Sequence, residues 1–314
     1  MTEAQKGIAA ALGANLIWGL SPLFWKQIGH VPPLEVFSHR TLWSAVLFGM
    51  VLALQGRFSA PFLLLASKRS FFVGTTAALL ISVNWLLYIY AVQVDRVVEA
   101  SLGYYIFPLV AVMLGYLIFR ENLRLSQWAG VGLALAAVVV LTVGLGVAPY
   151  ISLILAFSFG FYGMVKKQMD AGPVVSVTAE VMVIAPASLV WILGVHNFGW
   201  TDFTGRSGAV FGQHLWDSLL LIASGAVTAV PLILFSYASR RVSYSTIGVV
   251  QYSNPTMQFF LAAFVFGEVI TGAHMIAFTL IWIAVILYSL AAIRQERQSR
   301  RAVAARTTSG STVM

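Results

Sequence analysis

Apolar stretches of about 20 residues recur ten times along the chain, and mostly short connections separate them. A helix of that length crosses the roughly 30 Å hydrocarbon core of a bilayer, at about 1.5 Å per residue. Because the bilayer core offers no water to backbone groups, such segments must satisfy their own hydrogen bonds as helices. We therefore predict an all-α integral membrane protein with ten transmembrane helices. The predicted spans are residues 7–26, 34–54, 71–93, 98–118, 125–146, 149–168, 174–195, 214–236, 244–266 and 271–293.

Composition supports this fold class. Of the 314 residues, 59% are hydrophobic and 10% are charged, against about 25% charged in an average soluble domain. The chain has no cysteine, which excludes a disulfide scaffold and thiol redox chemistry. The net charge of +8 does not indicate a nucleic-acid partner, because the basic residues lie between apolar runs and in a tail, where topology signals belong.

The distribution of the 19 Lys and Arg residues predicts the orientation in the membrane. Most of them lie near the N-terminus, in every second connection and in the C-terminal segment. Since positive residues favour the cytoplasmic side, we expect both termini in the cytoplasm. The segment 294–314 is polybasic and rich in Ser and Thr, and we expect it to be a disordered cytoplasmic tail.

The chain repeats itself over about half its length. Three pairs of landmarks are separated by the same number of residues: Tyr90 with Tyr237, Pro108 with Pro255, and Glu121 with Glu268. We therefore predict a first five-helix repeat over residues 1–147 and a second over residues 148–293. Because five is odd, the second repeat must be inverted relative to the first. Inverted repeats are characteristic of secondary transporters that work by alternating access.

Two charged residues fall clearly inside predicted spans. Arg40 lies seven residues after Pro33, and Glu180 lies seven residues after Pro173, so the repeat gives them equivalent positions. A charge at such a depth costs about 2.5–3.5 kcal/mol on insertion scales and usually has a function. Each residue is about 10 Å from its own membrane face, so we do not expect a direct pair between them.

Partners on the same side of the membrane are available for both charges. We expect Glu99 near Arg40, and Lys166 or Lys167 near Glu180. These contacts could be static structural pairs. In the functional alternative, Arg40 attracts an anionic group of a substrate, while Glu180, Glu99 and Arg40 take part in coupling to a proton or ion.

Polar and aromatic side chains near these charges are candidates to line a substrate site, although helix packing and interhelical hydrogen bonds are the alternative role. Three amides of the predicted span 244–266, Gln251, Asn254 and Gln258, are spaced three and four residues apart, so they share one face of the helix. Besides Arg40 and Trp85, the candidate substrate-binding residues are Trp18, Lys26, His39, Trp43, Asn84, Tyr88, Tyr104, Tyr105, Gln251, Tyr252, Asn254 and Gln258.

Motifs of several enzyme classes are absent from the sequence. There is no GxxxxGK[ST] phosphate loop, no HExxH zinc motif, no GxSxG elbow and no acidic cluster spaced for a metal. We therefore expect neither catalysis nor ATP-driven pumping by this chain, and we expect no cofactor and no bound metal.

Several segments resemble a known family. KGIAAALGANLIWGLSPLFWKQI, PPLEVFSHRTLWS, NWLLYIYAV, VVEASLGYYIFPLV and STIGVVQYSNPTMQFFLAAFVFGE are similar to the RarD branch of the EamA family, in the drug/metabolite transporter superfamily. The resemblance covers about residues 7–293. It implies ten helices in two inverted repeats, a bacterial inner membrane location and a central cavity. Members are associated by name with chloramphenicol sensitivity, and many relatives export amino acids or other metabolites.

These observations favour a secondary-active transporter that moves a small amphipathic metabolite or drug, with export as the favoured direction. The partners we expect are the small-molecule substrate, a proton and the lipid bilayer, and the chain would act as a monomer or homodimer. A membrane receptor or sensor that binds a ligand without transporting it is the alternative from another class. The sequence leaves the substrate, the direction and the coupling ion open.

Overall fold

The computed structural model describes residues 2–120, 125–146, 148–166, 168–169, 171–239, 241–242, 250–287 and 290. The predicted tail and Glu121 lie outside these residues. The described elements are α1 (Glu3–Gln27), α2 (Pro33–Leu54), α3 (Ala60–Leu65), α4 (Lys68–Gln93), α5 (Val97–Phe119), α6 (Leu125–Leu145), α7 (Tyr150–Lys166), α8 (Pro173–Phe198), α9 (Leu215–Ser239), α11 (Ser253–Phe260) and the π-helix η1 (Leu261–Val265). Within the described part, β pairing is limited to one isolated bridge between Thr201 and Ser207.

The helices confirm an all-α membrane fold. Seven described helices, namely α1, α2, α4, α5, α6, α8 and α9, are long and apolar enough to cross a bilayer. Helix α7 and a helix over Gly272–Leu287 are apolar but shorter. The ninth predicted span is described only from residue 250, where α11 continues into η1. The number of ten spans therefore stays a prediction.

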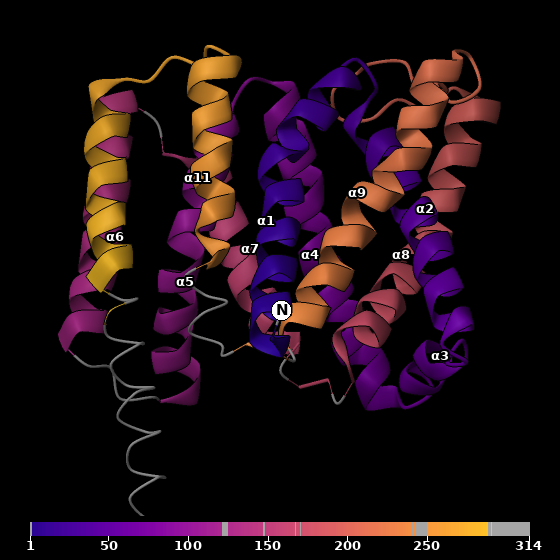
Figure 1. The fold of residues 1–314 in the computed structure, drawn as a ribbon. Coiled ribbons are helices and arrows are strands. Elements are labelled where there is room, and N and C mark those ends of the chain that lie inside the picture. Colours follow the sequence, from indigo (N-terminus) through magenta and orange to yellow (C-terminus); the bar gives the residue numbers. More distant parts are fainter. Residues whose placement is uncertain are drawn as a thin grey trace, which may run out of the picture.

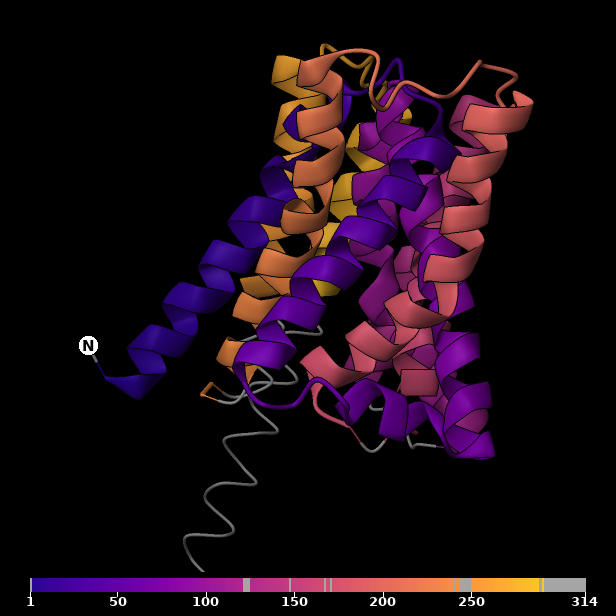
Figure 2. The same cartoon turned by 90° about the vertical axis from the view of Figure 1, so that its right-hand side faces the viewer.

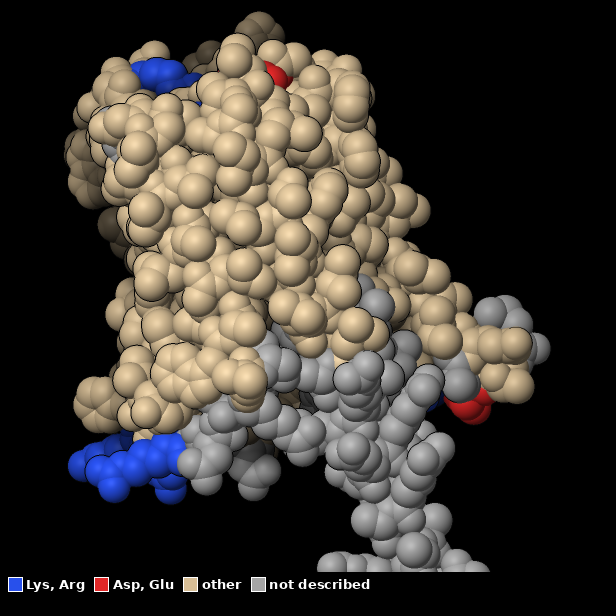
Figure 3. Space-filling model, turned by 90° about the vertical axis from the view of Figure 1, so that its left-hand side faces the viewer, with Lys and Arg blue, Asp and Glu red and all other residues tan. Residues whose placement is uncertain are grey.

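The bundle has two ends, which we name by what they carry. The N-terminal face holds the start of α1 and the short helix α3, at the lower end in Figure 1. The opposite face holds the connection between α8 and α9, which crosses the upper end in Figure 2. On the face drawn in Figure 3, the described residues between these two ends form a broad band without charged side chains. Its position is that of a bilayer core, because charged groups are excluded from hydrocarbon.

Local sequence signals explain where several helices begin. Thr2 and Gln5 form a capping box at the start of α1, with both reciprocal hydrogen bonds present. Helices α2 and α8 each begin at a proline, Pro33 and Pro173, which suits the first helical position because its missing N–H is not needed there. At the end of α8, Gly199 takes a left-handed conformation with φ 63°, which glycine adopts without strain.

The most extensive packing joins the two predicted halves of the chain. Helix α5 packs against α7, α2 against α8 and α9, and α1 against α9. These contacts come in matched pairs: α1 with α9 corresponds to α7 with α4, and α5 with α7 corresponds to α11 with α1. Two of these pairs are unequal: α2 packs on α9 more extensively than α8 packs on α4, and α5 packs on α7 more extensively than the described part of α11 packs on α1.

Glycine allows the close approach of α2 and α9. A Cβ atom built at Gly225 would lie 2.6 Å from the backbone carbonyl carbon of Trp43. Ser44, the next residue in α2, donates a hydrogen bond of 3.3 Å to the Gly225 carbonyl oxygen. Any side chain at this position must push the two helices apart.

We expect Gly225→Ala to lower the free energy of unfolding by about 1–3 kcal/mol, the usual cost of overpacking. Gly132→Ala is the matched control, because a Cβ there meets nothing within 4 Å and alanine is the better helix former by about 1 kcal/mol. Thermal unfolding of the purified proteins in detergent measures both. Equal melting temperatures for the two variants would contradict the close packing.

A distant carboxylate caps α5 at the opposite face. The side chain of Arg96, the N-cap residue, does not cap the helix. Instead Glu268 accepts hydrogen bonds from the backbone N–H groups of Val97 at 2.7 Å and Val98 at 2.8 Å. These donors have no partner within the helix, so Glu268 ties the segment after η1 to α5. Glu268, a landmark of the second repeat, thus caps a helix of the first half of the chain.

We expect Glu268→Ala to destabilise the protein by about 1–3 kcal/mol, because it leaves two buried donors unpaired. Burial raises the pKa of the Glu268 carboxyl, although hydrogen bonds from Val98 and Val97 oppose the rise. The folded state therefore holds this proton more tightly than the unfolded chain. The contribution to stability falls as the pH rises from about 4.3, the ordinary value for Glu, through the raised pKa.

Glu268→Gln removes this titration and should retain one hydrogen bond. The difference in melting temperature between the wild-type protein and Glu268→Gln should then shift against the wild type as the pH rises through that window. Parallel profiles for the two proteins would show that Glu268 does not titrate there.

Candidate functional site

Arg40 lies among aromatic side chains from separate helices. Helix α2 places it about 10 Å from the opposite face, and it is only 6% exposed. Its Nε donates a hydrogen bond of 2.7 Å to Oγ1 of Thr228 on α9. The guanidinium carbon lies 5.2 Å from the ring centroid of Trp25 on α1 and 4.2 Å from that of Trp85 on α4. Both distances are within the range of cation–π attraction.

Two tyrosines complete this environment. The phenol groups of Tyr88 on α4 and Tyr104 on α5 are electrostatic neighbours of Arg40, and their rings meet edge to face at 5.8 Å. The hydroxyl of Tyr88 lies 3.2 Å from Oγ of Ser21. We call Trp25, Arg40, Trp85, Tyr88, Tyr104 and Thr228 the Arg40 cluster. It combines one cation, flat apolar surfaces and hydroxyl groups.

Asn84 fixes one side of the cluster. Its Nδ2 donates to the Leu155 carbonyl oxygen at 2.9 Å and to Oγ of Ser158 at 3.0 Å, both on α7. Its Oδ1 accepts a hydrogen bond of 3.1 Å from the hydroxyl of Tyr104. Asn84 therefore joins α4 to α7 and holds the Tyr104 ring in place.

Arg40 has no acidic partner in the described part of the chain. Of the 11 acidic residues, the structure describes all except Glu121, Asp170 and Glu296. Each described acid is engaged elsewhere: Glu3 with Lys6 and Arg241, Glu35 with the N–H groups of Val210 and Phe211, Asp95 with Lys26, Glu99 with Arg96, Glu180 with Lys166, Asp202 with Thr204 and the Leu34 N–H, Asp217 with His30, and Glu268 with the start of α5.

The sequence-based pairing of Arg40 with Glu99 is therefore wrong. Arg96, three residues before Glu99, takes its carboxylate at 2.5 Å, and Arg96 also donates to the Tyr150 hydroxyl at 2.5 Å. Both partners lie at the end of the bundle, where α5 begins. Arg96 is close to Glu99 in the chain and lies at the same membrane face, whereas Arg40 lies deeper in the bundle. Glu99 therefore pairs with Arg96.

Glu180 forms the pair expected on its own side of the bundle. It is 1% exposed, and its Oε1 lies 2.8 Å from Nζ of Lys166 at the end of α7. Its Oε2 accepts a hydrogen bond of 3.0 Å from the hydroxyl of Tyr162. The Lys166 ammonium also donates to Tyr162 at 2.5 Å. A buried acid, a cation and a phenol thus share one network near the N-terminal face.

Other predicted residues lie outside the Arg40 cluster. Lys26 pairs with Asp95 at the opposite face. His39 is buried and stacks on Phe211 at 4.5 Å. The backbone of Trp43 forms the close contact with Gly225.

The remaining candidates lie around α11. Gln258 donates to Oδ1 of Asn254 at 2.9 Å and to the Trp18 carbonyl at 3.4 Å, so this contact joins α11 to α1. Tyr105 stacks with Tyr252 at 6.3 Å. Gln251 precedes α11 and is half-buried. These side chains are not shown in contact with Arg40.

Sequence reasoning missed three important neighbours: Trp25, Thr228 and Tyr162. Trp25 and Thr228 lie in uninterrupted apolar helices, where neither stands out. Tyr162 lies four residues before Lys166, on the same face of α7, and that spacing was the available signal.

The opposite face is closed by the segment between α8 and α9. Arg206 donates to the Gly29 carbonyl at 2.7 Å and to Oε1 of Gln93 at 2.5 Å. Glu35 at the start of α2 accepts from the N–H groups of Val210 at 2.9 Å and Phe211 at 3.2 Å. The segment thereby joins the ends of α1, α2 and α4.

The N-terminal face instead carries a pocket of about 280 Å³ between the ends of α2, α8 and α9. Its lining includes Leu52, Arg57, Val174, Ile233, Tyr237 and Arg241. If the second repeat is inverted as the sequence predicts, this pocket corresponds to the place at the opposite face that the α8–α9 segment fills. The two ends of the bundle therefore differ: one is closed by polar contacts, and the other is hollowed.

Comparisons with known proteins agree with this architecture. The profile of the EamA-like transporter family matches residues 5–143 and again residues 148–290. Protein RarD of Streptomyces exfoliatus is 40% identical over 299 residues, which cover 95% of this chain and 92% of that protein. Protein RarD of Escherichia coli is 35% identical, over 95% of this chain and 99% of that protein.

A solved crystal structure shares the fold, with a TM-score of 0.60 at 18% identity over 92% of this chain and 98% of that one. The profile match and the identity to RarD proteins over nearly the whole length show the family directly. The chain is a membrane transporter that belongs to the RarD branch of the EamA-like transporter family.

Proposed function

We propose that this protein is a secondary transporter that exports a small amphipathic anion across the bacterial inner membrane by alternating access. The observation that carries the proposal is the buried Arg40, which no acid in the described part of the chain compensates. A buried cation costs several kcal/mol unless something neutralises it. A substrate carboxylate is the ligand that would do so.

The surroundings of Arg40 favour a particular kind of substrate. The guanidinium lies against two tryptophan rings, at 4.2 and 5.2 Å, and tyrosine rings lie nearby. Arg offers planar donors that match a carboxylate, and the rings offer flat apolar surface. The substrate is therefore a small molecule with an anionic end and an apolar or aromatic body.

The asymmetry of the bundle supports alternating access. Two inverted repeats can exchange their packing, so that the closely packed end becomes the open one. The greater packing of α2 on α9 than of α8 on α4, with a pocket at the N-terminal face, fits one of two such states. With the N-terminal face in the cytoplasm, as the positive residues predict, this state faces inward.

Flux into proteoliposomes tests the proposal, with radiolabelled amino acids, other small carboxylates and amphenicols as the panel. We expect saturable flux in the wild type and a loss of about 10- to 100-fold in Arg40→Ala, because one charge-assisted hydrogen bond contributes about 1.5–3 kcal/mol. Arg40→Lys keeps the charge but not the planar contact with the rings, so it should be intermediate.

Arg69→Ala is the matched control, since Arg69 is an exposed cation at the start of α4. It should transport as the wild type does. Wild-type flux in Arg40→Ala would remove Arg40 from the site. Stabilisation by a ligand without any flux would favour the alternative function, a receptor or sensor.

We further propose that the network of Glu180, Lys166 and Tyr162 couples transport to a proton or ion. Lys166→Met should destabilise the protein by about 3–5 kcal/mol, because it leaves Glu180 buried without its cation. The double variant Lys166→Met with Glu180→Gln should recover most of that stability but not the transport rate. Thermal unfolding and flux at pH 5.5 and 7.5 measure the two effects. Normal, pH-dependent flux in the double variant would make the pair purely structural.

A further inference from the structure

We propose that the pocket at the N-terminal face is the vestibule of the route to Arg40, that it attracts small carboxylate-bearing anions, and that Phe48 is the plug that closes it. This inference rests on the transport function proposed above. It adds a second anion-binding site, in the pocket, to the one proposed at Arg40, and it identifies Phe48 as the residue that separates the two sites.

A continuous chain of contacts leads from the pocket to Arg40. Val174 and Ile233 line the pocket and also pack against a small buried cluster of Phe48, Val177, Val181 and Ala229. Trp85 packs against the same cluster. The Trp85 ring in turn lies 4.2 Å from the Arg40 guanidinium. One layer of apolar side chains therefore separates the vestibule from the Arg40 cluster.

Phe48 is the principal barrier in this layer. It is the only aromatic residue among the four fully packed members, and it is 0% exposed. It comes from α2, whereas Val177 and Val181 come from α8 and Ala229 comes from α9. These are the three helices whose ends form the pocket. A ring that bridges all three helices closes the route in this state, and it can leave the route only if α2 moves relative to α8 or the ring rotates.

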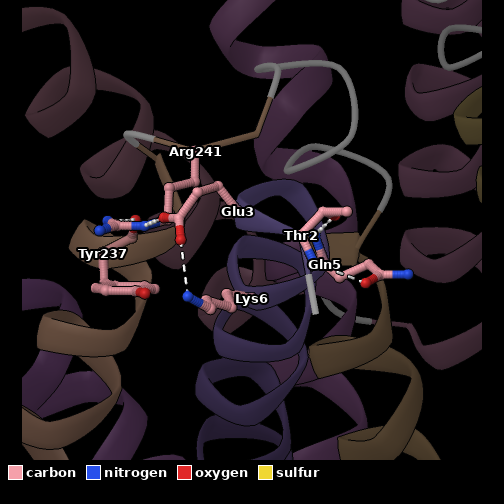
Figure 4. Close-up of polar contacts among 6 residues, drawn as sticks. All are labelled: Thr2, Glu3, Gln5, Lys6, Tyr237 and Arg241. Atoms are coloured by element: carbon pink, nitrogen blue, oxygen red, sulfur yellow. Dashed lines mark hydrogen bonds and ion pairs between the residues drawn. The ribbon is translucent and has the colours of Figure 1, made fainter.

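The vestibule carries positive charge. Arg57 and Arg241 line it. Glu3 lies between Lys6 at 2.8 Å and Arg241 at 2.9 Å, and the Arg241 guanidinium stacks on the Tyr237 ring at 3.5 Å (Figure 4). Hydrogen bonds from Lys6 and Arg241 lower the pKa of the Glu3 carboxyl, so it is ionised at neutral pH. These groups still sum to a positive charge at the rim.

The positive rim and the buried Arg40 select the same sign of charge at two points of one route. A hollow lined by one sign of charge raises the local concentration of the opposite ion. The corresponding place at the opposite face is filled by the α8–α9 segment, through Arg206 and Glu35. In this state, an anion can therefore enter the vestibule from the N-terminal face, and it reaches Arg40 only when Phe48 leaves the route.

Thiol labelling tests this route without requiring transport. The chain has no cysteine, so Thr228→Cys places a single thiol beside Arg40. The full-length variant, in phosphatidylcholine nanodiscs, is reacted with anionic sulfonatoethyl methanethiosulfonate or with the cationic trimethylammonium-ethyl reagent. We expect slow labelling, with the anionic reagent faster.

Adding Phe48→Ala should raise both labelling rates about tenfold or more, because reactivity follows the fraction of molecules with an open route. Phe58→Ala, at an exposed aromatic residue of the same face (56% exposed), is the control and should change nothing. Phe48→Leu is a milder substitution that tests the same point if Phe48→Ala does not fold.

Arg57→Glu should reverse the preference for the anionic reagent, whereas Arg69→Glu, outside the pocket, should not. Unchanged labelling in the Phe48 variants, or an unchanged preference in Arg57→Glu, would overturn the inference. So would a suppression of the anionic preference by added phosphatidylglycerol that is greater at Thr228→Cys than at Phe58→Cys, an exposed position of the same face that reports the surface potential alone, since the pocket would then hold a lipid headgroup. If labelling behaves as expected but no flux is found, the route stands and the transport function fails.

Discussion

The structure depends on one buried cation, Arg40, which has no acidic partner in the described part of the chain. In a soluble protein Arg40 could turn to water, but a membrane offers none, and every described acid is already engaged elsewhere. Two tryptophan faces and one threonine hydroxyl offset only part of the cost of its burial. We propose that the remaining cost gives the site its affinity for an anion. Glu180 had the opposite outcome, since Lys166 and Tyr162 satisfy it from the adjacent helix.

The difference between the two ends of the bundle determines from which side an anion would reach Arg40. At the opposite face, Arg206, Glu35 and Glu268 make polar contacts that cross from one half of the chain to the other. At the N-terminal face the halves leave a pocket, and an apolar layer around Phe48 lies between that pocket and Trp85. In the proposed transport cycle these closing contacts can open, because they are hydrogen bonds at the water interface, where solvent can replace them.

The sequence predicts the helices well because their signals are local. Apolar length fixes where α2, α4 and α8 lie, and Pro33 and Pro173 mark two of their starts. It also identifies Arg40 and Glu180, because a charge in an apolar run stands out. The sequence does not show which side chains from different helices contact one another. The sequence predicts that Glu99 pairs with Arg40, but in the structure Glu99 pairs with Arg96 on the preceding turn. The amides of Asn254 and Gln258 form a hydrogen bond with each other, and Gln258 also donates to α1, so neither contacts the Arg40 cluster. Trp25, Thr228 and Phe48 resemble ordinary apolar-helix residues until the packing brings them together.

The central claim is that Arg40 binds the negatively charged group of the substrate. Thermal-shift titration of the purified protein with matched ligands, phenylacetate and its neutral amide phenylacetamide first, tests it most directly. A ligand at about 100 times its dissociation constant stabilises the fold by about 2.7 kcal/mol, which is readily measured. We predict that the wild type is stabilised by the carboxylate more than by the amide, and that Arg40→Met loses this preference while remaining folded. Equal stabilisation by acid and amide in the wild type, or a preference that survives in Arg40→Met, would contradict the account.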